Sequence, residues 1–130
     1  MKILVGYENS RAAEAALNVA LKHARAFGAE LFIVTSLDQS HELTREDIEA
    51  VEDKLEKLKI TYKIDDIHCE THAIVSLLSP GEDLIEFSRD NDIDEIVIGV
   101  KKRSKVGKLV FGSNAQYVIL EADCNVVTVK

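Results

Sequence analysis

The sequence has little of what would indicate a disulfide scaffold or a membrane protein. Its two cysteines, Cys69 and Cys124, stand far apart and form no C-x-x-C pair, which favours a reduced intracellular protein over a disulfide framework. No apolar stretch approaches the length of a membrane span, and the apolar run at residues 3–5 has neither the h-region nor the cleavage site of a secretory leader. We therefore expect a cytoplasmic location and no membrane span.

Positive charge is also scarce, except in one short segment. The chain has a net charge of -7 and a pI near 5.1, whereas proteins that bind a nucleic-acid backbone usually present a basic surface, so no nucleic-acid partner is expected. Five basic residues nevertheless stand together without an acid among them: Lys101, Lys102, Arg103, Lys105 and Lys108. This basic segment, residues 101–108, is where an anion would be drawn.

Common catalytic patterns are missing as well. The sequence has no Ser-His-acid order and no paired-carboxylate pocket, so no catalytic residue is assigned. The pair Gly107-Lys108 resembles part of a P-loop, but Leu109 stands where Ser or Thr is required, which argues against a Walker-type NTPase.

The histidines do not indicate a metal site. His68, Glu70 and His72 alternate onto one face of a predicted strand, and we interpret them as solvated residues of a sheet edge. His23 and His41 stand isolated in the sequence. No metal-binding residues are therefore predicted.

Strand-length apolar runs alternate with segments of helical periodicity, which is typical of β-α-β units and a parallel sheet. With 130 residues, 46% of them hydrophobic, the chain fits one domain with a single core. The expected strands are residues 3–7, 30–37, 68–75, 95–100 and 125–129, and the expected helices follow Asn9 or Ser10, Thr44, Ser79 and Gly112. The prediction is an α/β fold: an open five-stranded parallel sheet, order 3-2-1-4-5, with helices on both faces.

In such a sheet, ligands bind beyond the carboxyl ends of the strands, at the point where the winding direction reverses. The first strand is that point, so residues 6–10 would face residues 99–113 across one crevice. The amides of Gly112, Ser113 and Asn114, at the start of a helix, could donate to phosphate oxygens with help from the helix dipole. The sequence thus predicts a phosphate-binding loop that requires no catalytic side chain.

Several motifs of this chain occur together in one known family. Residues 3–10 form a strand that leads into an alanine-rich helix, Pro80 opens the third helix, and residues 122–127 read Ala-Asp-Cys-Asn-Val-Val. A glycine signature falls on Gly99, Lys102, Gly112 and Ser113. Together these resemble the single-domain universal stress proteins, whose corresponding signature is G-x2-G-x9-G-[ST] and whose ending is Ala-x-Cys-Pro-Val-Leu.

The resemblance implies a Rossmann-like fold of the adenine nucleotide alpha hydrolase type that binds ATP or AMP, with or without Mg2+. It implies that Glu8, in place of the family's aspartate, meets the ribose hydroxyls or a phosphate-bound metal ion. The base would lie near Gly6, Tyr7 and Ser36, with Ile98 and Gly99 on the other side of the crevice. The phosphates would lie near Lys102, Arg103, Gly112, Ser113 and Asn114.

Lys102 is the main departure from the family pattern. If that position needs a positive φ, lysine costs about 1 kcal/mol relative to glycine, and its side chain could crowd the phosphates. As a point charge beside Lys101 and Arg103, it could instead bind them. We favour retained binding.

Three functions therefore stay open. The first is a nucleotide-responsive stress or regulatory module, whose residues position the ligand rather than react with it. The second is a slow ATPase or phosphotransferase, which is less favoured because no general base is evident. The third is a dimeric scaffold that binds no nucleotide. In each case a homodimer through the apolar edge strand Val126 to Val129 is expected, because an exposed edge would otherwise invite aggregation.

Overall fold

The computed structural model describes residues 1–8, 10–37, 39, 42–100 and 112–130, in which five strands alternate with four helices. The strands coincide with the expected ones to within one residue at each end. In chain order the elements are β1 (Lys2–Gly6), α1 (Arg11–Phe27), β2 (Glu30–Leu37), α2 (Arg45–Thr61), β3 (Cys69–Val75), α3 (Pro80–Asp90), β4 (Glu95–Gly99), α4 (Ser113–Glu121) and β5 (Asn125–Val129).

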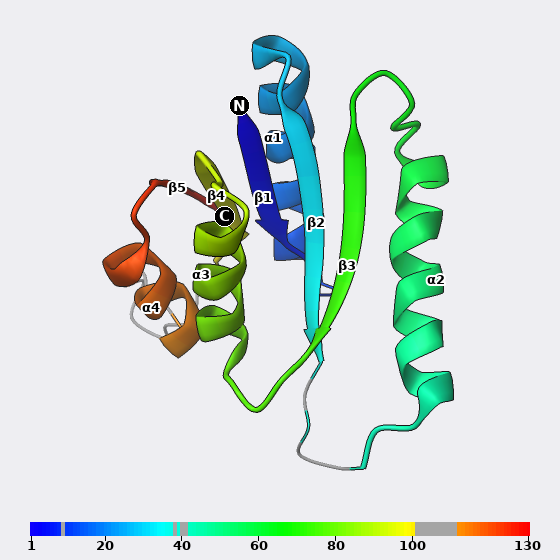
Figure 1. The fold of residues 1–130 in the computed structure, drawn as a ribbon. Coiled ribbons are helices and arrows are strands. Elements are labelled where there is room, and N and C mark those ends of the chain that lie inside the picture. Colours follow the sequence, from blue (N-terminus) through cyan, green and yellow to red (C-terminus); the bar gives the residue numbers. More distant parts are fainter. Residues whose placement is uncertain (9, 38, 40–41, 101–111) are drawn as a thin grey trace.

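The strands form one parallel sheet in the order β3-β2-β1-β4-β5, which confirms the predicted topology (Figure 1). In the centre of the sheet, Val5 of β1 pairs with Ile33 of β2 on one side and with Val97 of β4 on the other. The polar strand β3 lies at one edge, as its composition indicated, and β5 lies at the other. The winding direction therefore reverses at β1, between β2 and β4.

Two apolar cores pack against the two faces of the sheet. The central strands are buried on both faces, which requires nearly continuous apolar runs rather than alternation. One core joins the sheet to α1 and α2 and includes Ile3, Val5, Ala16, Leu17 and Leu55. The other joins it to α3 and α4 and includes Leu4, Phe32, Ile85, Ile96 and Val118. Figure 1 accordingly shows α1 behind the sheet and α3 in front of it.

Three of the helices begin at a side-chain cap. Ser10, Thr44 and Ser79 each accept a hydrogen bond from the backbone N–H three residues later, which satisfies one of the free amides of the first turn. Ser10 is thus the cap of α1, and Asn9 lies outside the described residues. The N-cap of α4 is Gly112, which supplies no side-chain hydrogen bond. Among the described residues, no side chain therefore caps the first amides of α4. None of the described helices has the length and apolar character needed to cross a membrane.

Candidate functional site

A cavity of about 320 Å³ lies beyond the carboxyl ends of β1 and β4, where the winding direction of the sheet reverses. Its size is within the usual range of small-molecule sites, about 300 to 1,000 Å³. Nine of the eleven residues that the sequence indicated for a nucleotide line it: Gly6, Tyr7, Glu8, Ser36, Ile98, Gly99, Gly112, Ser113 and Asn114. The other two, Lys102 and Arg103, lie outside the described residues.

The lining of the cavity has an apolar part and a polar part. The side chains of Val34, Leu84 and Ile98 belong to the core on the α3 and α4 face and form apolar walls. The polar part is the exposed start of α4, residues 112–114. The first turns of α1 and α3 also line the cavity, so three helix N-termini surround it. Because helix N-termini carry partial positive charge, this arrangement favours an anion.

The glycines that line the cavity are present for different reasons. A Cβ on Gly99 would lie 2.3 Å from the carbonyl oxygen of Ala12, so the close packing of α1 on β4 requires glycine there. Gly112 has φ -67° and ψ 163°, which any residue adopts, and a Cβ there would meet no atom of the described residues within 4 Å. Close packing therefore explains Gly99, whereas the missing side chain at Gly112 leaves a space beside the start of α4 that no described residue fills.

Tyr7 lines the cavity but has a structural role in the sheet. Its side chain packs against the core on the α1 and α2 face, and burial, followed by the nearby Tyr62 and Glu14, raises the pKa of its hydroxyl. Its backbone N–H donates to the carbonyl of Val34 at 2.8 Å, and its carbonyl accepts from the Thr35 hydroxyl at 2.6 Å. Both backbone groups of Tyr7 thus already have partners within the sheet.

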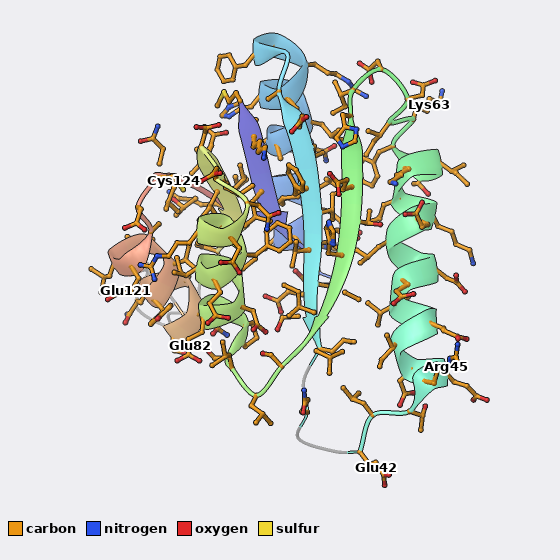
Figure 2. The ribbon with its side chains drawn as sticks, viewed as in Figure 1. Glu42, Arg45, Lys63, Glu82, Glu121 and Cys124 are labelled. Carbon is orange, nitrogen blue, oxygen red and sulfur yellow. The ribbon has the colours of Figure 1, made fainter. Side chains whose placement is uncertain are left out.

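Asp83 is a residue that the sequence analysis missed. It is only 3% exposed, and it holds the hydroxyl groups of two serines. Ser36, at the cavity wall, donates to Asp83 Oδ2, and Ser76 donates to Asp83 Oδ1 at 2.6 Å. Figure 2 labels the preceding residue, Glu82, at the start of α3, which is the end of the sheet where β2 and β3 finish. The capping box at Ser79 identified this helix start, but nothing in the local pattern distinguishes a buried Asp83 from a solvated one.

Asn114 connects the two helices beside the cavity. Its side-chain Oδ1 accepts a hydrogen bond from the backbone N–H of Gly81 at 3.0 Å, which joins the first turn of α4 to that of α3. A Cβ on Gly81 would lie 3.1 Å from the backbone oxygen of Asn114, so this approach is also close. The side chain of Asn114 therefore positions the start of α4, while the helix amides remain directed toward the cavity end.

His23, His68 and His72 are not among the residues that line this cavity, and His41 lies outside the described residues. On β3, His68 Nε2 is 3.0 Å from Glu70 Oε2 and His72 Nε2 is 3.4 Å from Glu70 Oε1, and the hydrogen bond with His68 is the first cause that lowers the pKa of Glu70. In the described part of the chain, no group of three or more His, Cys, Asp or Glu side chains is arranged to hold a metal ion. His23, which stands isolated in the sequence, has its Nδ1 2.7 Å from Glu95 Oε2. His23 and Glu95 are 72 positions apart, so only the folded chain brings them together.

Residues 1–130 match the model of the Universal stress protein family over their full length. The chain belongs to the universal stress protein family. It is 30% identical to the Thermus aquaticus protein described as "Universal stress protein in QAH/OAS sulfhydrylase 3'region", across 98% of this chain and 97% of that protein. It is also similar to a solved universal stress protein from Archaeoglobus fulgidus, with 34% identity and a TM-score of 0.84 over 100% of this chain and 98% of the other. A structure of the universal stress protein from the same organism in complex with dAMP gives 30% identity and a TM-score of 0.81, with the same coverage.

Proposed function

We propose that this universal stress protein binds an adenine nucleotide, ATP or AMP, in the cavity beyond β1 and β4, and that it acts as a nucleotide-responsive regulatory module. The observation that carries the proposal is the start of α4, where, among the described residues, Gly112 leaves room beside amides that no side chain caps. Such a helix start is a ready anion site. A relative of 30% identity has been solved in complex with dAMP, which supports the same class of ligand.

The two parts of the cavity suit the two parts of a nucleotide. The apolar walls around Gly6, Val34 and Leu84 suit the faces of a planar base, and the amides of α4 suit a phosphate. Glu8 is exposed at the cavity wall, where its carboxylate could meet ribose hydroxyls or a Mg2+ ion carried by the phosphates. In this arrangement Lys102 and Arg103 of the basic segment would add positive charge for the phosphate chain.

The same lining favours binding over catalysis. Among the described lining residues, only Glu8 and Tyr7 have side chains that titrate. Burial raises the pKa of Tyr7, so its hydroxyl stays protonated at neutral pH. Glu8 is exposed at the cavity wall, and we assign it to the ribose hydroxyls or a phosphate-bound Mg2+ rather than to proton transfer. We therefore propose that the residues position the nucleotide and that its presence changes contacts with a protein partner.

Calorimetric titration of the nucleotide-stripped protein with AMP and with ATP, with and without Mg2+, tests this proposal. The sharpest variant is Gly112→Ser. Serine is a good N-cap, so it should keep or slightly raise the stability of α4, while its hydroxyl occupies the amide and the space that we assign to phosphate. We expect micromolar binding by the wild type and at least a tenfold loss in the variant, with an unchanged fold by circular dichroism. Full affinity in Gly112→Ser would contradict the site, and no binding by the wild type would favour the scaffold.

The variant Lys102→Gly decides the part played by the lysine in the family signature. If Lys102 binds phosphate, the variant should bind ATP several-fold more weakly, and the loss should be smaller for AMP, which has one phosphate group. Tighter binding of both nucleotides by the variant would mean that the lysine obstructs the site. Titration at two salt concentrations separates these cases further, because only a phosphate contact makes the difference salt-dependent.

A further inference from the structure

We propose that Asp83 positions the Ser36 hydroxyl so that the cavity prefers a 6-aminopurine base over a 6-oxopurine base. This inference rests on the proposed function, because it concerns the base of a nucleotide in the same cavity. Ser36 lines the cavity from β2. Asp83, whose exposed fraction is 3%, lies behind Ser36 at the start of α3.

Each oxygen of the Asp83 carboxylate accepts one serine hydroxyl. Ser36 Oγ donates to Oδ2, and Ser76 Oγ donates to Oδ1 at 2.6 Å. Ser76 Oγ also accepts from the backbone N–H of Leu78 at 3.0 Å, so its own proton is the one directed to Asp83. Both carboxylate oxygens of Asp83 thus act as acceptors, and the residue lies in the first turn of α3.

The consequence is a fixed polarity at the cavity wall. A serine hydroxyl has one proton and two lone pairs, and the proton of Ser36 is committed to Asp83. Toward the cavity Ser36 therefore presents lone pairs only, so it can accept a hydrogen bond from a ligand but cannot donate one. An unconstrained serine would rotate to suit either kind of partner.

The neighbouring apolar walls indicate what Ser36 would meet. Val34 and Leu84 line the cavity on the side of Ser36, whereas the helix amides that suit phosphate lie at the start of α4. We place the base between these apolar walls with its polar edge toward Ser36, which lines the same cavity. The amino group at C6 of adenine donates to an acceptor, whereas the carbonyl at C6 of hypoxanthine would face lone pairs without a proton between them. A buried pair of acceptors is strongly disfavoured, and sites of this kind discriminate well.

The test is the ratio of dissociation constants for IMP and AMP, measured by calorimetry for the wild type and three variants. We expect the wild type to bind AMP at least about tenfold more tightly than IMP. In Asp83→Asn, the side-chain amide can donate to Ser36 and free the hydroxyl proton for a 6-oxo group, so the ratio should fall toward one. Ser36→Ala should also bring the ratio toward one, without disturbing the buried carboxylate as strongly.

Ser76→Ala is the matched control. It removes the other hydroxyl from Asp83, but Ser76 is absent from the described cavity wall, so thermal stability should fall while the ratio stays at the wild-type value. A purely structural role of Asp83 would weaken both nucleotides equally and leave the ratio unchanged. Equal binding of AMP and IMP by the wild type, or a wild-type ratio in both Ser36→Ala and Asp83→Asn, would overturn the inference while nucleotide binding stands. If neither nucleotide binds the wild type, the proposed function itself fails.

Discussion

At the scale of single residues, the close packing of α1 on the sheet depends on one glycine. A Cβ on Gly99 would lie 2.3 Å from the carbonyl oxygen and 2.9 Å from the Cβ of Ala12, and the nearer contact is to backbone, which cannot rotate away. We expect Gly99→Ala to lower the free energy of unfolding by about 1 to 3 kcal/mol, as overpacking does. Urea unfolding followed by circular dichroism measures the change. A variant as stable as the wild type would show that α1 does not pack this closely on β4.

A second prediction concerns the hydrogen bond between His23 and Glu95, at the end of the sheet away from the cavity. The side chain of Glu95 is 9% exposed, and His23 Nδ1 lies 2.7 Å from its Oε2. His23→Ala leaves this carboxylate without that partner, so we expect a loss of about 1 to 3 kcal/mol in the free energy of unfolding. His23→Gln, which keeps a donor, should lose less. Equal losses in the two variants would mean that the hydrogen bond contributes nothing.

The sequence could predict which residues line the cavity better than it could predict which side chains contact one another. Gly112, Ser113 and the other residues of the cavity wall stand in a local pattern, a strand end followed by a helix start, and local patterns are visible in a sequence. The partnership of Asp83 with Ser36 spans 47 positions, and neither residue type is unusual where it stands. Such contacts depend on which helix the fold places against which strand, so the sequence alone could not predict them.

Among the elements, α2 buries only one of its 17 residues, Leu55. A polar contact adds to its packing: the Thr71 hydroxyl of β3 donates to Glu56 Oε1 at 2.7 Å, and Lys59 Nζ lies 3.1 Å from the same oxygen. The hydrogen bond from Thr71, ahead of that from Lys59, lowers the pKa of Glu56. Both partners thus favour the charged carboxylate.

The lowered pKa of Glu56 determines how the stability of the fold changes with pH. Because the pKa of Glu56 is lower in the folded chain than its ordinary value near 4.5, this contact stabilises the fold above that value and the contribution is lost as the pH falls through the folded-state pKa. We expect Thr71→Val to raise the pKa of Glu56 toward 4.5, measured by NMR titration of the carboxyl carbon. Lys59→Gln should raise it less. An unchanged pKa in Thr71→Val would contradict the α2–β3 contact.

The elements were more predictable than their ends. The order of strands and helices could be predicted from the alternating apolar runs and from the caps at Thr44 and Ser79. Strand burial and the capping of free helix amides both leave short local patterns in a sequence. The first strand was expected to include Tyr7 but ends at Gly6. The carbonyl of Tyr7 accepts from the hydroxyl of Thr35 rather than from a strand backbone, and a side-chain contact of this kind has no signature in the sequence.

In the whole molecule, β5 is an edge strand that pairs only with β4 among the described strands. The backbone of Val129 faces β4, since its carbonyl accepts from Val100, so the alternate residues Val126 and Thr128 direct their backbone groups outward. Exposed edges of this kind invite pairing with another chain. The homodimer through Val126 to Val129 stays a proposal that this edge supports.

Sedimentation velocity at micromolar concentration tests the dimer. We expect the wild type to sediment as a dimer and Thr128→Pro as a monomer, because proline removes an outward donor while sparing the hydrogen bonds to β4. The melting curve of the variant serves as the control for folding. A monomeric wild type, or a dimeric Thr128→Pro, would place any interface elsewhere.

An NMR titration of the 15N-labelled protein with AMP shows whether an adenine nucleotide occupies the cavity beyond β1 and β4. We expect saturable changes in the amide signals of Gly6, Ser36 and residues 112–114, with little change at the opposite end of the sheet near Asp94. Saturable changes confined to other parts of the molecule, or none at millimolar AMP, would rule out this site.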